Sequence, residues 1–202
     1  MFKIASIVAV ATAVLFSSTA AQAVVLDYNA GALRIETAVT EKGFTTTALG
    51  ALAAVANYNW CNPQCSSNGS NYFMTYYAAG FSVKSVTGAA FNLTSFDAAE
   101  VFTNFAGAPT LQVTGYKVGG GTVIQSFTLD GINDGLNGLA DFQTFSLANF
   151  GNLSLVTFAA AASRPNFALD NVNVSLVPEP GTVALFGLGL VGIAAVKRRQ
   201  QA

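Results

Sequence analysis

Histidine is absent from the 202 residues of this chain. Ser–His and Cys–His nucleophile pairs and histidine-containing zinc sites are therefore excluded, because each needs an imidazole as base or ligand. A glycosidase that works with two carboxylates remains compatible with the composition, but no feature of the sequence selects two of its acidic residues. The composition therefore favours a protein that is not an enzyme.

Charged residues are also scarce, at 9% of the chain. Between residues 24 and 177 there are five lysines and arginines against nine aspartates and glutamates, which gives a net charge of −4. A nucleic-acid-binding surface needs clustered cations that face the phosphate groups. We therefore expect no nucleic-acid partner.

Cysteine occurs only twice, as Cys61 and Cys65. Two thiols without any histidine are too few ligands for a zinc site, and their C-x-x-x-C spacing differs from the C-x-x-C of thioredoxin-like oxidoreductases. In an exported protein the pair is expected to form a disulfide. A ring this small contributes about 2 kcal/mol at most through loop entropy, so its predicted role is to pin a loop.

The N-terminus has the three parts of a secretory signal peptide. The positive charge of Lys3 precedes an apolar stretch at residues 4–16, and Ala21 and Ala23 form an A-x-A cleavage site. The sequence therefore predicts a signal peptide over residues 1–23. Export would use the Sec translocon, and signal peptidase would cut after Ala23.

The C-terminus begins with the Pro178-Glu179-Pro180 motif, in which each proline interrupts helix and sheet because it lacks an N–H donor and has a fixed φ. An uncharged stretch follows over residues 181–196. As a helix it would be about 24 Å long, slightly less than the roughly 30 Å of a bilayer core, so we expect a short transmembrane helix. The cations after it are expected to act as a stop signal and remain cytoplasmic. They are Lys197, Arg198 and Arg199.

These three parts, with the Gly- and Leu-rich run from Ala184 to Leu190, closely resemble the PEP-CTERM sorting signal of Gram-negative bacteria, also known as an ice-binding-protein C-terminal domain. The resemblance covers residues 178–202. It implies recognition by an exosortase, a membrane cysteine transpeptidase that cuts near the Pro-Glu-Pro motif and is associated with exopolysaccharide and biofilm production. The protein would be held briefly in the inner membrane and then reach the cell surface or extracellular matrix. The alternative is an ordinary membrane anchor that is never cleaved.

Between the two ends, residues 24–177 form short runs with alternating apolar and polar residues, separated by Gly, Asn, Asp, Ser and Pro. Three glycines at 119–121 predict the turn of a hairpin, because they tolerate the positive φ of a tight turn. Residues 48–57 are ambiguous between a helical turn and a loop wall. We predict a mainly-β fold, a single antiparallel jelly-roll-like β-sandwich. Its expected strands are 24–28, 33–39, 43–47, 72–77, 81–86, 91–96, 111–114, 123–129, 142–147, 153–158 and 167–176.

Asp170 has the same strand parity as Val172 and Val174, so a regular strand would point its side chain into the core. A carboxylate there needs a compensating partner. A β-bulge at Asp170 and Asn171 is the alternative, because it would turn the side chain toward backbone N–H groups or solvent.

The region from Phe91 onward has phenylalanines at strand positions and ends in the Asp170-Asn171 pair, and in this it resembles carbohydrate-binding jelly rolls. That resemblance implies a structural Ca²⁺ bound by Asp170 and by an acid from an early strand. Asp27 is the first candidate, and Asp97 or Glu100 follow. No other cofactor is expected.

Aromatic and amide side chains gather around the two cysteines, between residues 57 and 77. Aromatic rings stack on sugar rings and amides bind sugar hydroxyls, so Trp60, Tyr76 and Asn62 are candidate glycan contacts. The alternative is that half of the rings belong to the core and the rest to an ordinary hydrated loop.

The sequence predicts an exported, exosortase-processed surface or matrix protein that is associated with exopolysaccharide and is not an enzyme. A purely structural or adhesive component without a ligand site is one alternative, and a secreted glycosidase is another.

Overall fold

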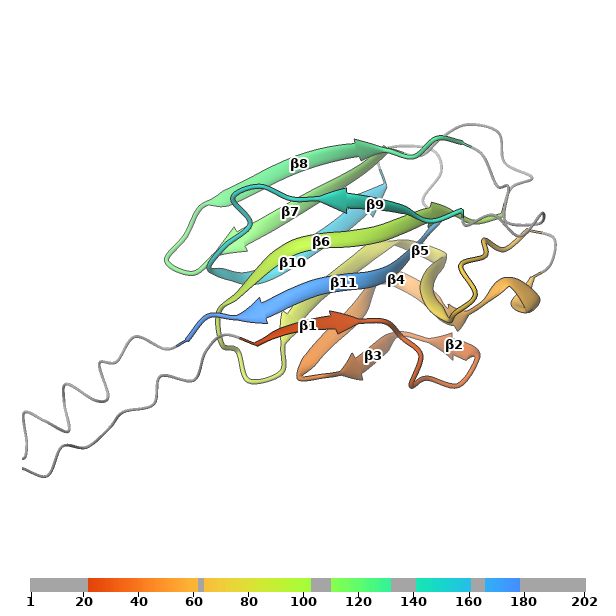
Figure 1. The fold of residues 1–202 in the computed structure, drawn as a ribbon, viewed down its shortest axis with the longest axis horizontal. Helices are drawn as coiled ribbons and strands as arrows, with labels where there is room; N and C mark the ends of the chain where they lie inside the picture. The colour runs from red at the N-terminus through yellow and green to blue at the C-terminus, as the bar shows by residue number, and fades with distance from the viewer. Residues whose placement is uncertain (1–21, 62–63, 103–109, 132–140, 161–165, 179–202) are drawn as a thin grey trace, which may run out of the picture. The chain divides into compact units, whose positions relative to one another are not determined.

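The computed structural model describes residues 22–61, 64–102, 110–131, 141–160 and 166–178 (Figure 1). Residues 21–177 form one compact unit, and residues 1–20 and 178–202 are grouped separately. Within the described residues, no helix has the length and apolar character needed to cross a membrane. Several predicted features lie outside the described residues: Ala21 and the signal peptide before it, Asn62, Glu179, Pro180, the helix expected at 181–196, Lys197, Arg198 and Arg199.

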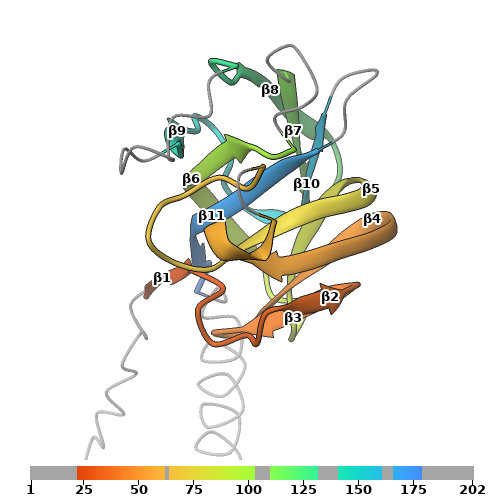
Figure 2. The ribbon, with the colours of Figure 1, turned by 90° about the vertical axis from the view of Figure 1, so that its right-hand side faces the viewer.

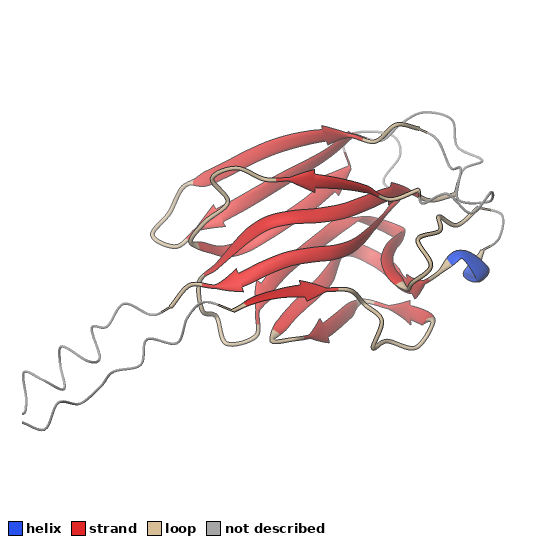
Figure 3. Cartoon of the chain, in the orientation of Figure 1, coloured by secondary structure: helices blue, strands red, loops and turns tan. Residues whose placement is uncertain are grey.

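Strands make up almost all of the regular structure, which confirms the predicted mainly-β class (Figure 3). All strand pairings in the described residues are antiparallel. The strands are β1 (Ala23–Leu26), β2 (Arg34–Glu36), β3 (Ala38–Glu41), β4 (Phe44–Ala56), β5 (Tyr72–Ser85), β6 (Phe91–Glu100), β7 (Thr110–Lys117), β8 (Thr122–Thr128), β9 (Gln143–Ser146), β10 (Leu153–Ala160) and β11 (Phe167–Leu176), and a 3₁₀ helix, η1, spans Tyr58–Trp60.

The strands lie in two layers, which Figure 2 shows from the side. In one layer the order is β4, β5, β10, β7 and β8, and the short strands β2 and β3 line the outer edge of β4. In the other layer β11 pairs with β1 and β6, and β6 pairs with β9. The layers join where β5 also pairs with β11 and where Leu153 of β10 pairs with Phe91 of β6. The result is a nearly closed antiparallel sandwich, as predicted.

Phenylalanines from both layers fill the space between them. Phe81 and Phe167 meet edge to face with their ring centroids 5.3 Å apart, and Phe96 and Phe158 do so at 5.1 Å. All four side chains are fully buried. Aromatic pairs prefer such geometry over face-to-face stacking. The alternation that predicted the strands places these rings on the inner faces.

Residues 48–56 belong to strand β4. The sequence-based alternatives for residues 48–57, a helical turn or a loop wall, were therefore wrong. Ala53 and Val55 face the main core, and Ala54 and Ala56 face a second hydrophobic cluster on the other side of the sheet. A strand that is buried on both faces loses the alternation of apolar and polar residues. Its small side chains let the covering segment approach closely.

Two further boundaries differ from the sequence prediction. The expected strand at 33–39 is divided into β2 and β3, and the expected strands at 72–77 and 81–86 form one continuous strand, β5. The chain passes from one pairing partner to the next at Gly80, which has a φ of 154°. A Cβ atom at this position would collide with the carbonyl oxygen of Phe158 on β10, so a glycine is required there.

The second hydrophobic cluster lies under the segment that joins β4 to β5. Its buried members include Cys65, Tyr72 and Met74, and Trp60 and Tyr76 pack against them while remaining half-buried. This cluster fixes the position of the joining segment on the outside of the sandwich.

Candidate functional site

The segment between β4 and β5 is shaped by local hydrogen bonds and by a disulfide. Asn57 precedes η1, and its side-chain oxygen accepts a hydrogen bond from the backbone N–H of Asn59 at 3.1 Å. Such capping is a frequent role of asparagine. Cys61 and Cys65 form the predicted disulfide, with their Cα atoms 5.2 Å apart. The buried Cys65 anchors this ring in the second cluster.

An open pocket of about 380 Å³ lies beside this segment. Its described lining consists of amide and hydroxyl side chains, one aromatic ring and one glycine, and no charged side chain is among them. The lining residues are Asn29, Asn57, Tyr58, Asn59, Ser67, Gly69, Ser70 and Asn71.

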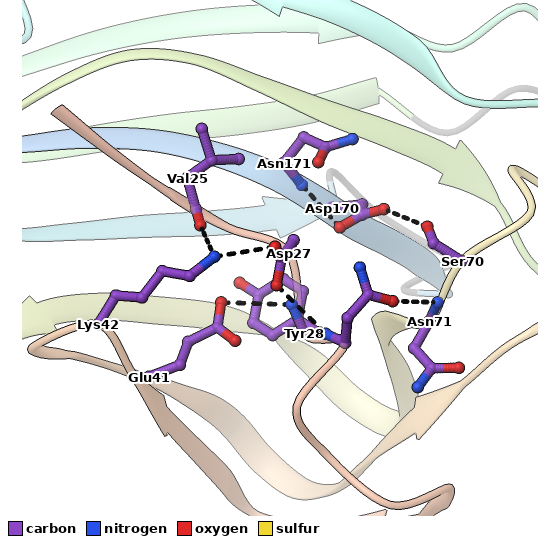
Figure 4. A network of polar contacts seen from close by, with 10 residues as sticks. Val25, Asp27, Tyr28, Glu41, Lys42, Ser70, Asn71, Asp170 and Asn171 are labelled. Carbon is purple, nitrogen blue, oxygen red and sulfur yellow. Dashed lines mark hydrogen bonds and ion pairs between the residues drawn. The ribbon is translucent and has the colours of Figure 1, made fainter.

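Hydrogen bonds between amide groups hold the pocket together. The Asn57 side-chain N–H donates to the side-chain oxygen of Asn71 at 3.1 Å. The Asn71 backbone N–H donates to the side-chain oxygen of Asn29 at 3.0 Å, a bond that Figure 4 shows at Asn71. Within the described part of the chain, the side-chain amide of Asn59 has no hydrogen-bond partner, and the same holds for the amide nitrogen of Asn29. Both residues line the pocket.

Asp170 holds the segment around Asn68 and Ser70 in place through buried hydrogen bonds. Its side chain is 1% exposed, which confirms that it faces inward. One oxygen accepts a hydrogen bond from the Asn68 amide at 2.6 Å. The same oxygen accepts one from the Ser70 hydroxyl at 3.1 Å, and the other oxygen accepts the backbone N–H of Asn171 at 2.7 Å, and Figure 4 shows both of these bonds. Burial raises the pKa of Asp170 to about 6, although these three donors oppose the rise.

The expected bulge is present as well. The register between β11 and β6 shifts after Asp170, and Asn171 has a φ of 46°. The two interpretations of Asp170 therefore coexist: the side chain is buried, and the bulge offers it a backbone N–H.

Asp27, the other candidate calcium ligand, is engaged elsewhere. Its carboxylate lies 2.8 Å from Lys42 Nζ, and this cation holds the pKa of Asp27 below its usual value (Figure 4). Among the described residues, no three acidic or cysteine side chains are grouped closely enough to hold a metal ion. Calcium binding by Asp27 and Asp170 stays a prediction.

Trp60 and Tyr76 do not line the pocket. Both pack against the second cluster, and the ring of Tyr76 lies 5.8 Å from that of Phe102. Their proposed contact with a glycan stays a prediction, and their positions favour the alternative of a packing role. Asn62, the third candidate, lies outside the described residues.

None of the lining residues is among the three candidate glycan contacts, although all of them except Asn29 lie within the aromatic and amide-rich stretch at residues 57–77. Tyr58 is two positions before Trp60, and the short 3₁₀ turn directs these rings to different surroundings. Asn29 is 42 positions from Asn71 in the chain, and only the folded structure brings the two together. No signal in the sequence pairs them.

Amide side chains donate and accept hydrogen bonds with the same group, which suits the vicinal hydroxyls of a sugar. An aromatic side chain such as Tyr58 can cover the apolar face of a sugar ring. The described lining residues include amide, hydroxyl and aromatic groups that can form these contacts, and no carboxylate is among them.

Comparisons with known proteins give one sequence match and several similar structures. No curated protein matches the sequence. The xylan-binding CBM22-1 domain of Paenibacillus barcinonensis Xyn10C is 16% identical, with a TM-score of 0.39, over 78% of this chain and 95% of that domain. The family 11 carbohydrate-binding module of Clostridium thermocellum Lic26A-Cel5E is 13% identical, with a TM-score of 0.37, over 80% of this chain and 99% of the module.

The CBM22-1 and GH10 modules of Clostridium thermocellum xylanase 10B, in complex with xylohexaose, are 14% identical to this chain with a TM-score of 0.42. The match covers 76% of this chain and 28% of that protein. None of these values assigns a function to the chain. The sequence match is to the PEP-CTERM protein-sorting motif, over residues 176–199. The C-terminal end of this chain is therefore a PEP-CTERM sorting signal.

Proposed function

We propose that this protein is an exported, exosortase-processed protein of the cell surface or extracellular matrix, and that its pocket binds a neutral glycan, such as exopolysaccharide, without cleaving it. The sorting motif implies an exported protein that passes through the membrane of a Gram-negative bacterium and is recognised by an exosortase. The surface or matrix destination is the further step of the proposal.

The end of the folded unit supports processing at the motif. The Val177 backbone N–H donates to the carbonyl oxygen of Ala90 at 2.8 Å, and the next residue, Pro178, is exposed. A transpeptidase needs an accessible, extended segment, and a proline cannot continue a strand's hydrogen-bonding ladder. The motif thus begins directly after Val177, which is anchored to the sandwich.

The observation that carries glycan binding is the uncharged, amide-lined pocket of about 380 Å³. Anionic ligands would require cations in the lining, and cationic ligands would require acids. Amide, hydroxyl and aromatic groups instead match a neutral polyhydroxylated ligand. Because the pocket is open, it suits a segment of a longer chain.

The same lining supports binding without catalysis. Glycoside hydrolysis requires two carboxyl groups on either side of the scissile bond, about 5 to 10 Å apart. Such a pair is missing from the described lining of the pocket. Glycosidase activity therefore remains the weaker alternative.

Binding should be measured with the exported protein on an array of neutral and acidic bacterial polysaccharides, followed by calorimetry. Tyr58→Ala and Asn59→Ala should each reduce affinity about tenfold, the equivalent of one or two lost hydrogen bonds or a lost stacking contact. Tyr116→Ala and Gln112→Ala remove the same kinds of side chain from exposed positions of β7 and serve as matched controls.

Equal affinities for the pocket variants and the controls would contradict the pocket assignment. A wild-type protein that retains no polysaccharide would instead support a purely structural or adhesive role. Shortening of a bound polysaccharide would establish the glycosidase.

A further inference from the structure

The sandwich has several sheet edges, and most of them are protected against pairing with another chain. β2 is three residues long and carries Arg34 and Glu36, and β3 is four residues long and ends at Glu41. At the edge of β1, Lys42 Nζ donates to the carbonyl oxygen of Val25. Short length, charge and capping are common means of blocking edge-to-edge association.

Strand β8 has none of these features. It is seven residues long, contains neither a charged residue nor a proline, and in the described part of the chain pairs only with β7. Ile124, near its middle, is 57% exposed. Tyr116 and Val118 of the same hairpin are also exposed. Figure 1 shows β8 along the outer border of its layer.

The hairpin geometry defines which backbone groups face outward. The Lys117 N–H donates to the Gly121 carbonyl oxygen at 3.0 Å, so Lys117 and Gly121 are a hydrogen-bonded pair. Such pairs recur at every second residue of an antiparallel ladder. The N–H and C=O groups of the intervening residues therefore point to the open edge. These residues are Thr122, Ile124, Ser126 and Thr128.

We propose that β8 pairs antiparallel with β8 of a second copy of this chain, about a two-fold axis at Gln125. In this register Thr122 lies opposite Thr128 of the second copy, and Ile124 lies opposite Ser126. Every outward backbone group of the strand gains a partner, and the exposed Ile124 side chain becomes covered. The sheets of two molecules become continuous.

Charges at the ends of β8 select a second copy and this orientation. Lys117 precedes the turn, and the exposed Asp130 follows the strand at its other end. Antiparallel pairing brings Lys117 of each copy toward Asp130 of the other, whereas parallel pairing would bring like charges together. Complementary charges at an interface fix register and suppress other partners.

The two-fold symmetry of the contact determines the size of this assembly. A two-fold contact uses the same surface on both molecules and closes on itself, so a dimer forms rather than a filament. Pairing of seven-residue strands buries less than the roughly 1,200 to 2,000 Å² of stable interfaces, so the dimer should be weak and concentration-dependent.

The full-length chain with Thr122→Cys and Thr128→Cys, expressed in cells that export it, tests the register. Thr122 and Thr128 lie at opposite ends of β8, so a short bis-maleimide can join them only between molecules, where paired Cα atoms are about 5.5 Å apart. A cross-linked dimer should form about tenfold more readily in this variant than in either single-cysteine variant, where the reactive positions lie at opposite ends of the interface.

Adding Ile124→Lys to the double-cysteine chain places two like charges at the interface and should abolish the cross-link. Gln112→Lys introduces the same charge on the exposed face of β7, one strand away from the edge, and should leave it intact. Protease resistance of the exported chains verifies that each variant folds. The proposal is overturned by a double-cysteine chain that yields no more dimer than the single variants, by a cross-link that survives Ile124→Lys, or by cross-linking to a polypeptide of different mass.

Discussion

Asp170 is a buried carboxyl group whose ionisation state depends on two opposing effects. Removal from water favours the neutral form, whereas the three donors from Asn68, Ser70 and Asn171 favour the anion. Burial is the larger effect, and the pKa of about 6 exceeds the roughly 3.9 of an aspartate in an unfolded chain. Between these two pH values the folded protein binds more protons than the unfolded one.

This difference predicts an unusual pH dependence of stability. Protonation of Asp170 in the folded state contributes fully to the free energy of unfolding below about pH 4, and this contribution is lost as the pH rises through about 6. The free energy of unfolding should therefore increase by about 1 kcal/mol when the pH is lowered from 7.5 to 5. Glu41 and Glu100 act in the same direction, because burial raises the pKa of each. Melting temperatures across this range should fall with rising pH, and Asp170→Asn should flatten the profile.

Asp27→Asn is the matched control, because Lys42 keeps the pKa of Asp27 low and the group stays ionised throughout that range. A profile that is identical in Asp170→Asn and in the wild type would contradict the assignment. The same melts with calcium and with a chelator test the calcium prediction. If Asp170 binds calcium, the ion should raise the melting temperature of the wild type, and Asp170→Asn should remove this rise.

The inward position of Asp170 could be predicted from the sequence, but its hydrogen-bond partners could not. Strand parity was sufficient to place Asp170 in the core, because alternation is a local property of the backbone. Its partners Asn68 and Ser70 are 102 and 100 positions away in the chain, and no local pattern encodes them. Asn29 was missed for the same reason.

Substitutions at Gly80 and Gly88 distinguish a steric collision from an unfavourable positive φ. Gly80→Ala combines a φ of 154° with a collision at the Phe158 carbonyl and should lower the free energy of unfolding by about 2 kcal/mol or more. Gly88 also has a positive φ, 76°, but open space surrounds it. Gly88→Ala should therefore lower the free energy of unfolding by only about 1 kcal/mol. Denaturant unfolding of the two variants provides the comparison, and equal losses would show that close approach at Gly80 is unimportant.

At the scale of elements, the segment between β4 and β5 presents one ring to the pocket and another to the second cluster. Trp60→Ala should lower the free energy of unfolding by about 2 to 4 kcal/mol, because a large side chain is removed from a packed site. Tyr116→Ala, at an exposed position, should change it by less than about 0.5 kcal/mol. Thermal melts combined with polysaccharide retention distinguish the two roles of Trp60. Lost retention with an unchanged melting temperature would restore Trp60 as a glycan contact.

Strands with one buried and one exposed face were predictable from the sequence, and β7 is an example, with Leu111 and Val113 buried and Gln112 exposed between them. The alanine-rich half of β4 was not, because both of its faces are covered and the pattern becomes continuous. The union of two predicted strands in β5 was missed because glycine usually marks a turn, whereas Gly80 continues the strand in close contact with β10.

At the scale of the whole molecule, the sorting signal gives a prediction about processing. Replacing Pro178, Glu179 and Pro180 by alanine should leave a full-length protein in the inner membrane, because the extended, accessible break is replaced by good helix formers. Mass spectrometry of the membrane and surface fractions measures the outcome. A wild-type surface protein that still carries residues 197–202 would identify an uncleaved anchor.

The order of strands in the sandwich also bears on when folding can finish. Of the described strands, β11 is the last to emerge during export, yet it pairs with β1, β5 and β6. Until it arrives, these strands lack a neighbour, and exported chains that stop before Phe167 should therefore stay sensitive to protease. The domain closes only once Leu176 has crossed the membrane, immediately ahead of Pro178. Completion of the fold and arrival of the sorting signal thus become nearly simultaneous, so a processing enzyme that waits for the signal receives a finished domain rather than a nascent one.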